Sequence, residues 1–186
     1  IGMGKSTVAK MIADEYGAPI HDADAVVLAL LGPKGLAVAA VAETFPESFD
    51  RKEKQINRAK LAGVVFDDVE KKEALEAILH PMVRDAQKHF LQQNSRSKFV
   101  VLDIPLLFET GGEANCDYTI CVTAPYHIQM QRVMARDMSE EEFKGRLAMQ
   151  MPDVEKRNRA GCTVNTGLSF ADTLKQIKKI MRKIKG

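Results

Sequence analysis

The residues best suited to chemistry stand at the beginning of the chain, where Gly2-Met3-Gly4-Lys5-Ser6-Thr7 leads into an apolar helical pattern. This order matches the second half of the phosphate-binding pattern G-x-x-x-x-G-K-[ST], whose first glycine would precede Ile1. Glycines let backbone N–H groups face phosphate oxygens, Lys5 adds positive charge, and the Ser6 hydroxyl suits Mg²⁺. The helix also points the positive end of its dipole at the anion. The stretch predicts a nucleotide site, with a glycine-rich helix start that binds nothing as the alternative.

Phosphoryl transfer also needs a carboxylate beside the acceptor hydroxyl, and candidates follow two predicted strands. Asp22 and Asp24 come after a short strand at 19–21, and Asp103 lies in the apolar strand 99–104. Because the carboxyl ends of parallel strands share one edge of a sheet, we expect all three near the phosphate loop. For Asp22 and Asp24 the structural alternative is a turn that caps a helix beginning near Ala25. For Asp103 it is a loop cap.

The elements that must position these groups alternate between strands and helices. Further strands are predicted at 118–122 and 162–164, with helical patterns between the strands. The alternation predicts an α/β fold in which a parallel sheet carries helices on both faces. We expect residues 26–95 to be helical without a strand, with a kink or helix boundary near His80 because Pro81 follows it.

Arginine-rich helices are predicted at 125–159, with Ser139 as an N-cap before three glutamates. The last helix is expected to begin near Ser169, with a narrow apolar stripe and lysines opposite. The stripe consists of Phe170, Leu174, Ile177, Met181 and Ile184.

Composition bounds the class of protein. The 186 residues suffice for one domain, and 45% apolar with 28% charged residues is typical of a globular protein. Six of the 27 basic residues lie in the last dozen positions, so the remaining 21 face 25 acidic residues, which argues against a nucleic-acid partner. No apolar run is long enough to span a membrane. Three cysteines without metal-site spacing indicate the reducing cytoplasm. Whether the chain forms a homo-oligomer stays open.

Four further motifs follow the phosphate loop in a fixed order. They are His21-Asp22-Ala23-Asp24, Leu79-His80-Pro81-x-x-Arg84, Leu102-Asp103-Ile104-Pro105-Leu106-Leu107-Phe108-Glu109 and Gln131-Arg132-Val133-Met134-x-Arg136-Asp137, with Arg146 and Gln150 after them. Together with the loop, this series resembles the signature of the dephospho-CoA kinase family from Ile1 to about Gly167. The phosphate loop is shared by many unrelated enzymes, whereas the later motifs in this order are far more specific.

The resemblance implies transfer of the γ-phosphate of ATP to the ribose 3′-hydroxyl of dephospho-CoA, the last step of coenzyme A synthesis. It implies a single kinase domain over 1–186, with a P-loop kinase core at 1–25, 96–124 and 160–186. A helical acceptor-binding insertion would occupy 26–95, and a helical lid 125–159. ATP and Mg²⁺ are the implied cofactors, and dephospho-CoA is the implied small-molecule partner.

The resemblance also assigns roles to the matching positions. Catalytic roles fall to Asp24, Lys5 and Arg136, with Arg132 and Arg146 as competing lid arginines. ATP binding falls to Gly2, Met3, Gly4, Lys5, Ser6, Thr7, Arg132 and Arg146. Acceptor binding falls to Asp22, His80, Arg84, Leu106 and Glu109, and Mg²⁺ binding to Ser6 and Asp103. In the family, the loop Val164-Asn165-Thr166-Gly167 approaches the adenine; here that loop and Ala160-Gly161 depart from the commonest form.

Three other functions remain alternatives. A nucleoside or nucleotide monophosphate kinase shares the same core, but the motifs after Asp24 argue against it. A non-catalytic nucleotide switch of the GTPase kind would carry Asn-Lys-x-Asp after a late strand, and the sequence has none. A binding protein would use the basic C-terminal helix to dock on an acidic partner or a membrane surface, although such a helix more often packs on the core.

Overall fold

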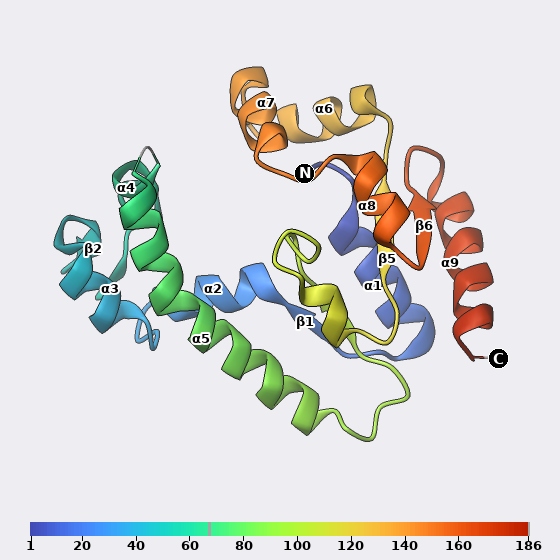
Figure 1. Cartoon of the computed structure of the whole chain (residues 1–186), viewed down its shortest axis with the longest axis horizontal. Coiled ribbons are helices and arrows are strands. Elements are labelled where there is room, and N and C mark those ends of the chain that lie inside the picture. Colours follow the sequence, from blue (N-terminus) through green and yellow to red (C-terminus); the bar gives the residue numbers. More distant parts are fainter. Residues whose placement is uncertain (67, 186) are drawn as a thin grey trace. The chain divides into compact units, whose positions relative to one another are not determined.

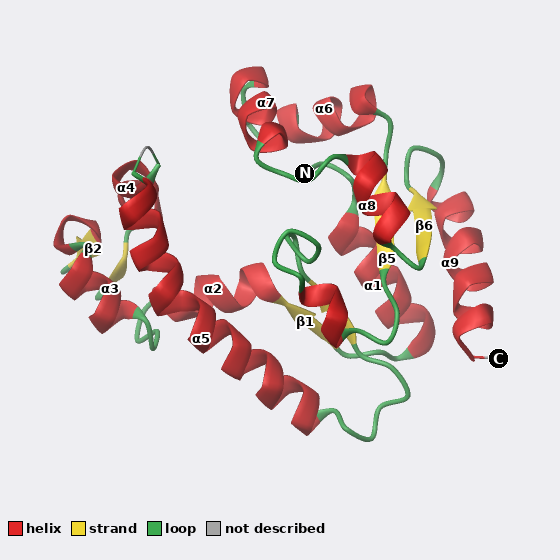
Figure 2. Ribbon diagram, viewed as in Figure 1, coloured by secondary structure: helices red, strands yellow, loops and turns green. Residues whose placement is uncertain are grey.

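The computed structural model describes residues 1–66 and 68–185 and divides into two compact units (Figure 1). One unit comprises Ile1–Ile20 with Asp103–Gly186, and the other comprises His21–Leu102. Helices predominate in both, with short strands between them (Figure 2). The α/β class predicted from the sequence is confirmed. Across the described residues, no helix has the length and apolar content needed to cross a bilayer.

The first unit contains a parallel strand pair packed between helices. Its elements are α1 (Lys5–Tyr16), η2 (Gly112–Asn115), β5 (Ile120–Thr123), α6 (Tyr126–Met134), α7 (Glu140–Ala148), α8 (Asp153–Arg159), β6 (Cys162–Asn165) and α9 (Phe170–Lys185). β5 and β6 pair in parallel, from Ile120 opposite Cys162 to Thr123 opposite Asn165. Helix α9 contacts β6 and α1, and α8 contacts β5 (Figure 1). Both strands lie within two residues of their predicted positions.

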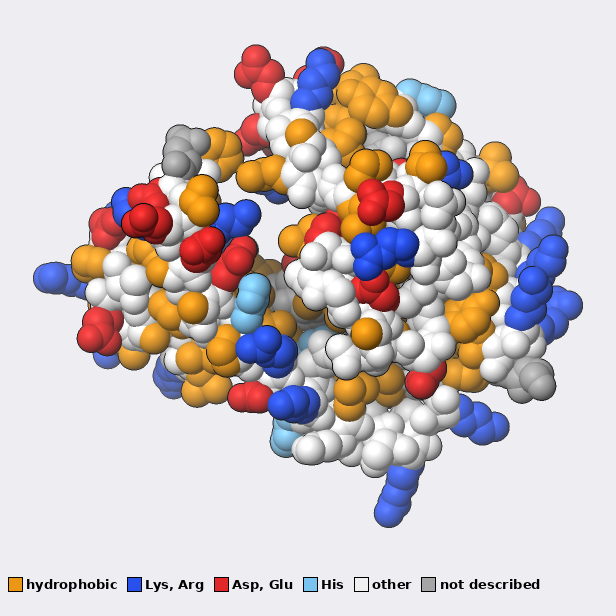
Figure 3. Space-filling model, viewed as in Figure 1, with side chains coloured by type: hydrophobic (Ala, Val, Ile, Leu, Met, Phe, Trp, Pro, Cys, Tyr) orange, Lys and Arg blue, Asp and Glu red, His pale blue; other side chains and the backbone are white. Residues whose placement is uncertain are grey.

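Helix α9 packs on the first unit through its apolar stripe. Ile177 and Met181 are buried, and Lys178 forms an ion pair of 2.8 Å with Glu15 on α1. Basic side chains gather along α9 on the outer surface (Figure 3). Phe170, predicted as the first residue of the apolar stripe, is 73% exposed, because it stands at the very start of the helix. The stripe therefore serves the core, as such helices usually do.

The second unit is mainly helical around its own apolar cluster. Its elements are α2 (Ala23–Leu31), α3 (Val38–Thr44), η1 (Pro46–Ser48), β2 (Phe49–Asp50), β3 (Gln55–Ile56), α4 (Arg58–Val65) and α5 (Val69–Gln93). The cluster includes Leu31, Val41, Phe45 and Ile56, each at most 4% exposed. At the ends of this segment, β1 (Ile20–Asp22) pairs with β4 (Val101–Asp103).

The expectation that residues 26–95 lack strands is wrong. β2 and β3 form a short antiparallel hairpin, with Phe49 opposite Ile56. Its turn is held locally, since the Asp50 carboxylate accepts hydrogen bonds from the N–H groups of Lys52 and Glu53 at 3.0 and 3.1 Å. Strands of two residues are too short to show the alternation of apolar and polar residues by which strands are predicted.

Of the two alternatives predicted near His80, the helix boundary is wrong, because α5 continues from Val69 to Gln93 with Pro81 inside it, and the kink stays a prediction. Proline removes one backbone hydrogen bond, to the carbonyl of Ala77. Ala77 and Pro81 are both exposed, so water can satisfy that carbonyl. Packing of α5 against α2, α3 and α4 holds the helix together on the opposite face.

We expect the buried thiol of Cys121 on β5 to make stability depend on pH. Burial, with a smaller contribution from Asp153, raises its pKa from 9.0 to about 11. The contribution of this protonated thiol to the free energy of unfolding is complete below pH 9. It is lost as the pH rises toward about 11, because in that range only the unfolded chain releases the thiol proton. The loss is at most about 2–3 kcal/mol. Chemical denaturation of wild type and Cys121→Ala between pH 8 and pH 11 should give a shallower decline for the variant; parallel declines would contradict this.

Candidate active site

The phosphate loop adopts a backbone that requires glycine at two positions. Gly2 and Gly4 have positive φ of 70° and 83°, and Gly4 is the N-cap of α1. A Cβ on Gly2 would lie 2.9 Å from the carbonyl oxygen of Gln129, which is closer than real side chains approach. Ser6 and Thr7 are exposed in the first turn of α1. The loop and the helix start therefore present backbone N–H groups and two hydroxyls at one place, as an anion site requires.

Lys5 and Asp103 form an ion pair within the first unit. Asp103 ends β4 and is 3% exposed, whereas the Lys5 side chain is 35% exposed. A carboxylate so deeply buried needs a cation to offset its lost hydration. The structure thus brings together the residue predicted to bind phosphate and the residue predicted to bind the metal. It also gives Lys5 a second function, the neutralisation of Asp103.

Arg132 and Thr166 form hydrogen bonds with backbone carbonyls of the phosphate loop. Arg132, on α6, donates through one terminal nitrogen to the Gly2 carbonyl at 3.2 Å and to the Thr166 hydroxyl at 2.9 Å. Its other terminal nitrogen donates to the Thr166 carbonyl at 2.7 Å. The Thr166 hydroxyl donates in turn to the Met3 carbonyl at 2.7 Å. Arg132, which the sequence suggested for ATP binding, therefore supports the backbone of the loop directly.

Sequence reasoning missed the role of Thr166, which is 6% exposed and follows β6 directly. Its backbone N–H continues the parallel pairing by donating to the Thr123 carbonyl at 2.9 Å. A hydroxyl at the carboxyl end of a predicted strand was the available signal, since sites in parallel sheets gather at that edge. Contacts over such sequence separations cannot be read from spacing.

The other two lid arginines have their side chains exposed. Arg136 lies in the turn after α6, and Arg146 lies in the last turn of α7. Neither forms an ion pair or hydrogen bond through its side chain with the described residues. Both guanidinium groups are therefore available to a ligand.

Ser139 caps α7 in a reciprocal capping box with Glu142, which confirms the predicted helix start.

Glu109 joins the segment after β4 to α8. Its carboxylate pairs with Lys156 at 2.7 Å and accepts a hydrogen bond of 3.0 Å from the Met151 N–H. Burial alone would raise the pKa of the Glu109 carboxyl, but these hydrogen bonds outweigh it and leave the pKa below its usual value. Leu106, in the same segment, is 42% exposed. The structure thus gives Glu109 a bridging position, while Leu106 is open to contact.

The acceptor-side candidates of the second unit lie on two helices. Asp22 caps α2, because its carboxylate accepts a hydrogen bond of 3.0 Å from the Ala25 N–H. Asp24 is exposed in the first turn of the same helix. His80 and Arg84 are exposed one turn apart on α5, so they share a face. Asp22 therefore has the structural role of a helix cap, which was the alternative to a role in chemistry. Asp24 is the exposed aspartate of the two.

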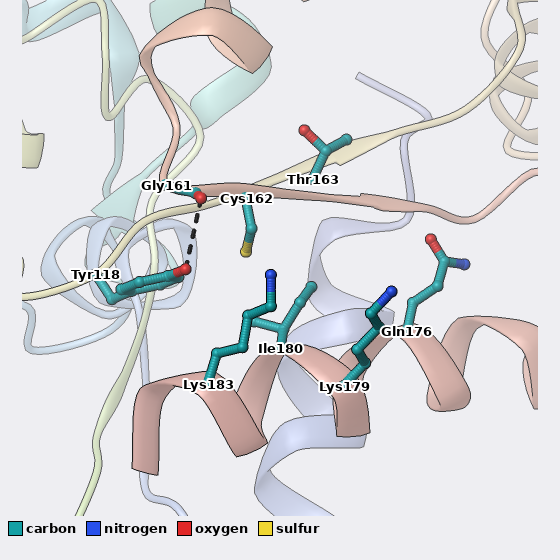
Figure 4. A pocket seen from close by; sticks show the side chains of 8 residues that line it. All are labelled: Tyr118, Gly161, Cys162, Thr163, Gln176, Lys179, Ile180 and Lys183. Atoms are coloured by element: carbon teal, nitrogen blue, oxygen red, sulfur yellow. Dashed lines mark hydrogen bonds between the residues drawn. The ribbon is translucent and has the colours of Figure 1, made fainter. Parts of the chain in front are cut away.

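A hollow of about 290 Å³ lies between β6 and α9, and no residue of the phosphate loop lines it (Figure 4). The sulfur of Cys162 and the amines of Lys179 and Lys183 point into it (Figure 4). Burial raises the pKa of the Cys162 thiol, and Tyr118 and Lys183 only partly offset this. The thiol is therefore protonated at neutral pH and is a poor nucleophile.

The chain is similar to known proteins over almost its full length. The family model described as dephospho-CoA kinase matches residues 1–172. The chain belongs to the dephospho-CoA kinase family. A dephospho-CoA kinase of Novosphingobium aromaticivorans is 41% identical over 100% of this chain and 91% of its own. One from Paramagnetospirillum magneticum is 45% identical over 100% of this chain and 88% of its own. The family resemblance inferred from the motifs is confirmed.

Solved structures agree with this dephospho-CoA kinase assignment. A protein of Thermus thermophilus superposes with a TM-score of 0.84 at 35% identity, covering 100% of this chain and 94% of its own. A dephospho-CoA kinase from Campylobacter jejuni gives a TM-score of 0.69 at 29% identity, covering 99% of this chain and 92% of its own. The family match includes every predicted site residue, from Gly2 to Arg146.

The Lys5–Asp103 pair allows stability and chemistry to be separated. Lys5→Ala should lower the free energy of unfolding by about 1–3 kcal/mol, because it leaves Asp103 buried without its cation. It should also lower turnover by on the order of 10²–10³-fold, since charge on the phosphates is lost.

The double variant Lys5→Ala/Asp103→Asn is the control. It should regain most of the stability in denaturant titrations but none of the turnover. Near-wild-type turnover of Lys5→Ala at saturating Mg-ATP would refute the phosphate-loop assignment.

Proposed function

We propose that this chain transfers the γ-phosphate of ATP to the ribose 3′-hydroxyl of dephospho-CoA, the last step of coenzyme A synthesis. The observation that carries the proposal is a formed phosphate loop with Lys5 at its end, in a chain that the dephospho-CoA kinase model matches over residues 1–172. Phosphoryl transfer depends mainly on positioning and charge, so the residues can be assigned by what each offers the reacting groups.

The donor half of the reaction belongs to residues of the first unit. Met3 and Gly4 would offer N–H groups to the phosphates, and Thr7 would add a hydroxyl in the first turn of α1. Lys5 would place its ammonium on the β- and γ-phosphates, where a mobile point charge suits changing geometry. The N-terminus of α1 adds its partial positive charge at the same point.

Mg²⁺ belongs to the proposal as the ion that accompanies ATP. The residues present fit it in type, because Ser6 offers an exposed hydroxyl and Asp103 a carboxylate. The described residues contain no cluster of three or more His, Cys, Asp or Glu side chains that could hold a metal ion. Ser6 would hold the ion through its hydroxyl, and Asp103, one of whose oxygens accepts from Lys5, would help to hold it through its carboxylate. When bound, the ion would neutralise charge on the phosphates.

The lid helices supply the remaining positive charge. Arg136 and Arg146 are exposed in the segment 125–159 and would approach the transferred group when the lid closes. Charge that develops on the equatorial oxygens of the transferring phosphoryl group is stabilised best by fixed cations in a dry site. Arg132 contributes indirectly, through its contacts with Gly2 and Thr166.

The acceptor half of the reaction belongs mainly to the second unit. Asp24 would accept the proton of the ribose hydroxyl, and its exposure in α2 supports this over Asp22, whose carboxylate already caps the helix. His80 and Arg84, on one face of α5, would bind the phosphate groups of dephospho-CoA. Leu106 and Glu109 would border the acceptor, with Leu106 contacting its apolar parts.

A cytoplasmic location is part of the same proposal. Cys116, Cys121 and Cys162 are all free thiols, which suits a reducing compartment.

The function is tested by an acceptor panel with Mg-ATP. Purified protein should convert dephospho-CoA to CoA far faster than it phosphorylates AMP or adenosine. Arg84→Ala should raise the KM for dephospho-CoA by roughly tenfold and leave the KM for ATP within about twofold, because it removes only acceptor binding. Lys88→Ala, which removes another exposed basic side chain of the same helix, is the matched control. Equal efficiency with AMP would favour the nucleotide monophosphate kinase instead.

The mechanism is tested by replacing each of the two aspartates with asparagine. Asp24→Asn keeps the shape of the side chain but loses its basicity, so kcat should fall by on the order of 10²-fold or more. Affinity for ATP should hardly change, because Lys5 and the loop bind it. Asp22→Asn is a clean control, since asparagine caps helices as well as aspartate does.

Single-turnover phosphoryl transfer and ATP calorimetry on both variants distinguish the outcomes. Wild-type chemistry in Asp24→Asn with none in Asp22→Asn would reverse the assignment. If both variants show wild-type chemistry, neither aspartate is the base, and Asp103 is the next candidate.

A further inference from the structure

Two backbone carbonyls of the phosphate loop are held by side chains that do not touch the reacting groups in the proposed chemistry. The Gly2 carbonyl accepts from Arg132 at 3.2 Å, and the Met3 carbonyl accepts from the Thr166 hydroxyl at 2.7 Å. These are consecutive carbonyls of the loop, each held by a different element. Two adjacent peptide planes are therefore fixed in orientation.

The orientation of these planes decides where the loop's donors point. In a trans peptide the carbonyl of one residue and the N–H of the next point in opposite directions. Fixing the Gly2 and Met3 carbonyls toward Arg132 and Thr166 therefore turns the Met3 and Gly4 N–H groups the other way. Within the described part of the chain, neither N–H donates to an acceptor. Two successive N–H groups directed to one side form a concave anion site.

Thr166 is the residue through which this arrangement is anchored. Its hydroxyl donates to Met3 and accepts from Arg132 at 2.9 Å, while its own carbonyl accepts from Arg132 at 2.7 Å. Its N–H is tied to the Thr123 carbonyl of β5 at 2.9 Å, so the strand pair fixes its position. Gly4 packs directly against it, since a Cβ there would lie 3.2 Å from the Thr166 hydroxyl.

We propose that Thr166 is a positioning residue for polyphosphate binding: with Arg132, it fixes the Gly2 and Met3 carbonyls so that the Met3 and Gly4 N–H groups face the ligand's phosphates. The inference rests on the proposed use of the loop as a phosphate site. This role differs from a contact with the adenine, because the hydroxyl of Thr166 already donates its hydrogen bond to the Met3 carbonyl. The affinity that it controls should therefore be affinity for phosphate groups, whatever base they carry.

Thr166→Val tests this, since valine keeps the shape of threonine and removes only the hydroxyl. Calorimetry should show weaker binding of ATP and of inorganic tripolyphosphate, each by on the order of tenfold, because the Met3 carbonyl loses its donor. Thr166→Ser, which keeps the hydroxyl, should bind both within about twofold of wild type. Affinity for dephospho-CoA should be the same in all variants.

Thr173→Val is the matched control. Thr173 is also a buried threonine of the first unit, 3% exposed, and its hydroxyl donates to the Ser169 carbonyl at 3.0 Å, within α9. Its replacement should leave affinity for both ligands unchanged. If Thr173→Val loses as much affinity for ATP and tripolyphosphate as Thr166→Val, the cause is general destabilisation of the fold, and the proposal is overturned.

Other outcomes separate the inference from the proposed function. If Thr166→Val loses affinity for ATP but not for tripolyphosphate, Thr166 acts on the base and the proposal is wrong. If it binds both ligands like wild type, the hydroxyl does not position the loop. If wild-type protein binds neither ligand, the phosphate site itself fails, and the inference falls with it.

A measurement on the wild-type protein keeps the test independent of how the variants fold. Tripolyphosphate added to ¹⁵N-labelled protein should shift the amide signals of Met3 and Gly4 strongly, as their N–H groups acquire an acceptor. Unchanged signals for both residues under saturating ligand would overturn the proposal.

Discussion

An anion site made of backbone N–H groups imposes one constraint on everything around it: its carbonyls must find donors elsewhere. Each peptide plane presents both groups, so a loop that offers N–H to phosphate necessarily turns its carbonyls into the protein. Here Arg132 and Thr166 meet that requirement for Gly2 and Met3. The positions of α6 and of the end of β6 follow, since each must carry its donor to the back of the loop.

Lys5 has a related role, because the buried Asp103 carboxylate also needs a partner within the protein. In our proposal the Lys5 ammonium binds phosphates, yet Asp103 is buried and has Lys5 as its ion-pair partner. An ion pair of this kind contributes little net stability, although breaking it leaves a buried charge uncompensated. A polyphosphate chain that draws Lys5 away would therefore leave Asp103 in need of a new positive partner. The Mg²⁺ ion of our proposal would be that partner, which would couple ligand binding to the electrostatics of the site.

The sequence predicted those parts of the structure that depend on local chemistry. The glycines of the loop, the Ser139 cap and the paired strands β5 and β6 follow from conformational preference and from apolar runs. Long-range contacts were beyond its reach, because nothing in spacing indicates that Thr166 meets Met3 across the chain. The hairpin of β2 and β3 was missed because it is too short to leave a pattern. Pro81 misled because tertiary packing along α5 outweighs one lost hydrogen bond.

The three arginines of the segment 125–159 show how burial separates roles that sequence alone leaves equivalent. Arg132 is half-buried and donates three hydrogen bonds to Gly2 and Thr166, so moving it would leave those acceptors unpaired. Arg136 and Arg146 are exposed, and their side chains form no ion pair or hydrogen bond with the part of the chain that the structure describes. Stabilising a transferring phosphoryl group requires charge that is free to meet it. Arg132 is therefore held in its contacts with the loop, whereas Arg136 and Arg146 are the arginines that our proposal assigns to the transferred phosphoryl group.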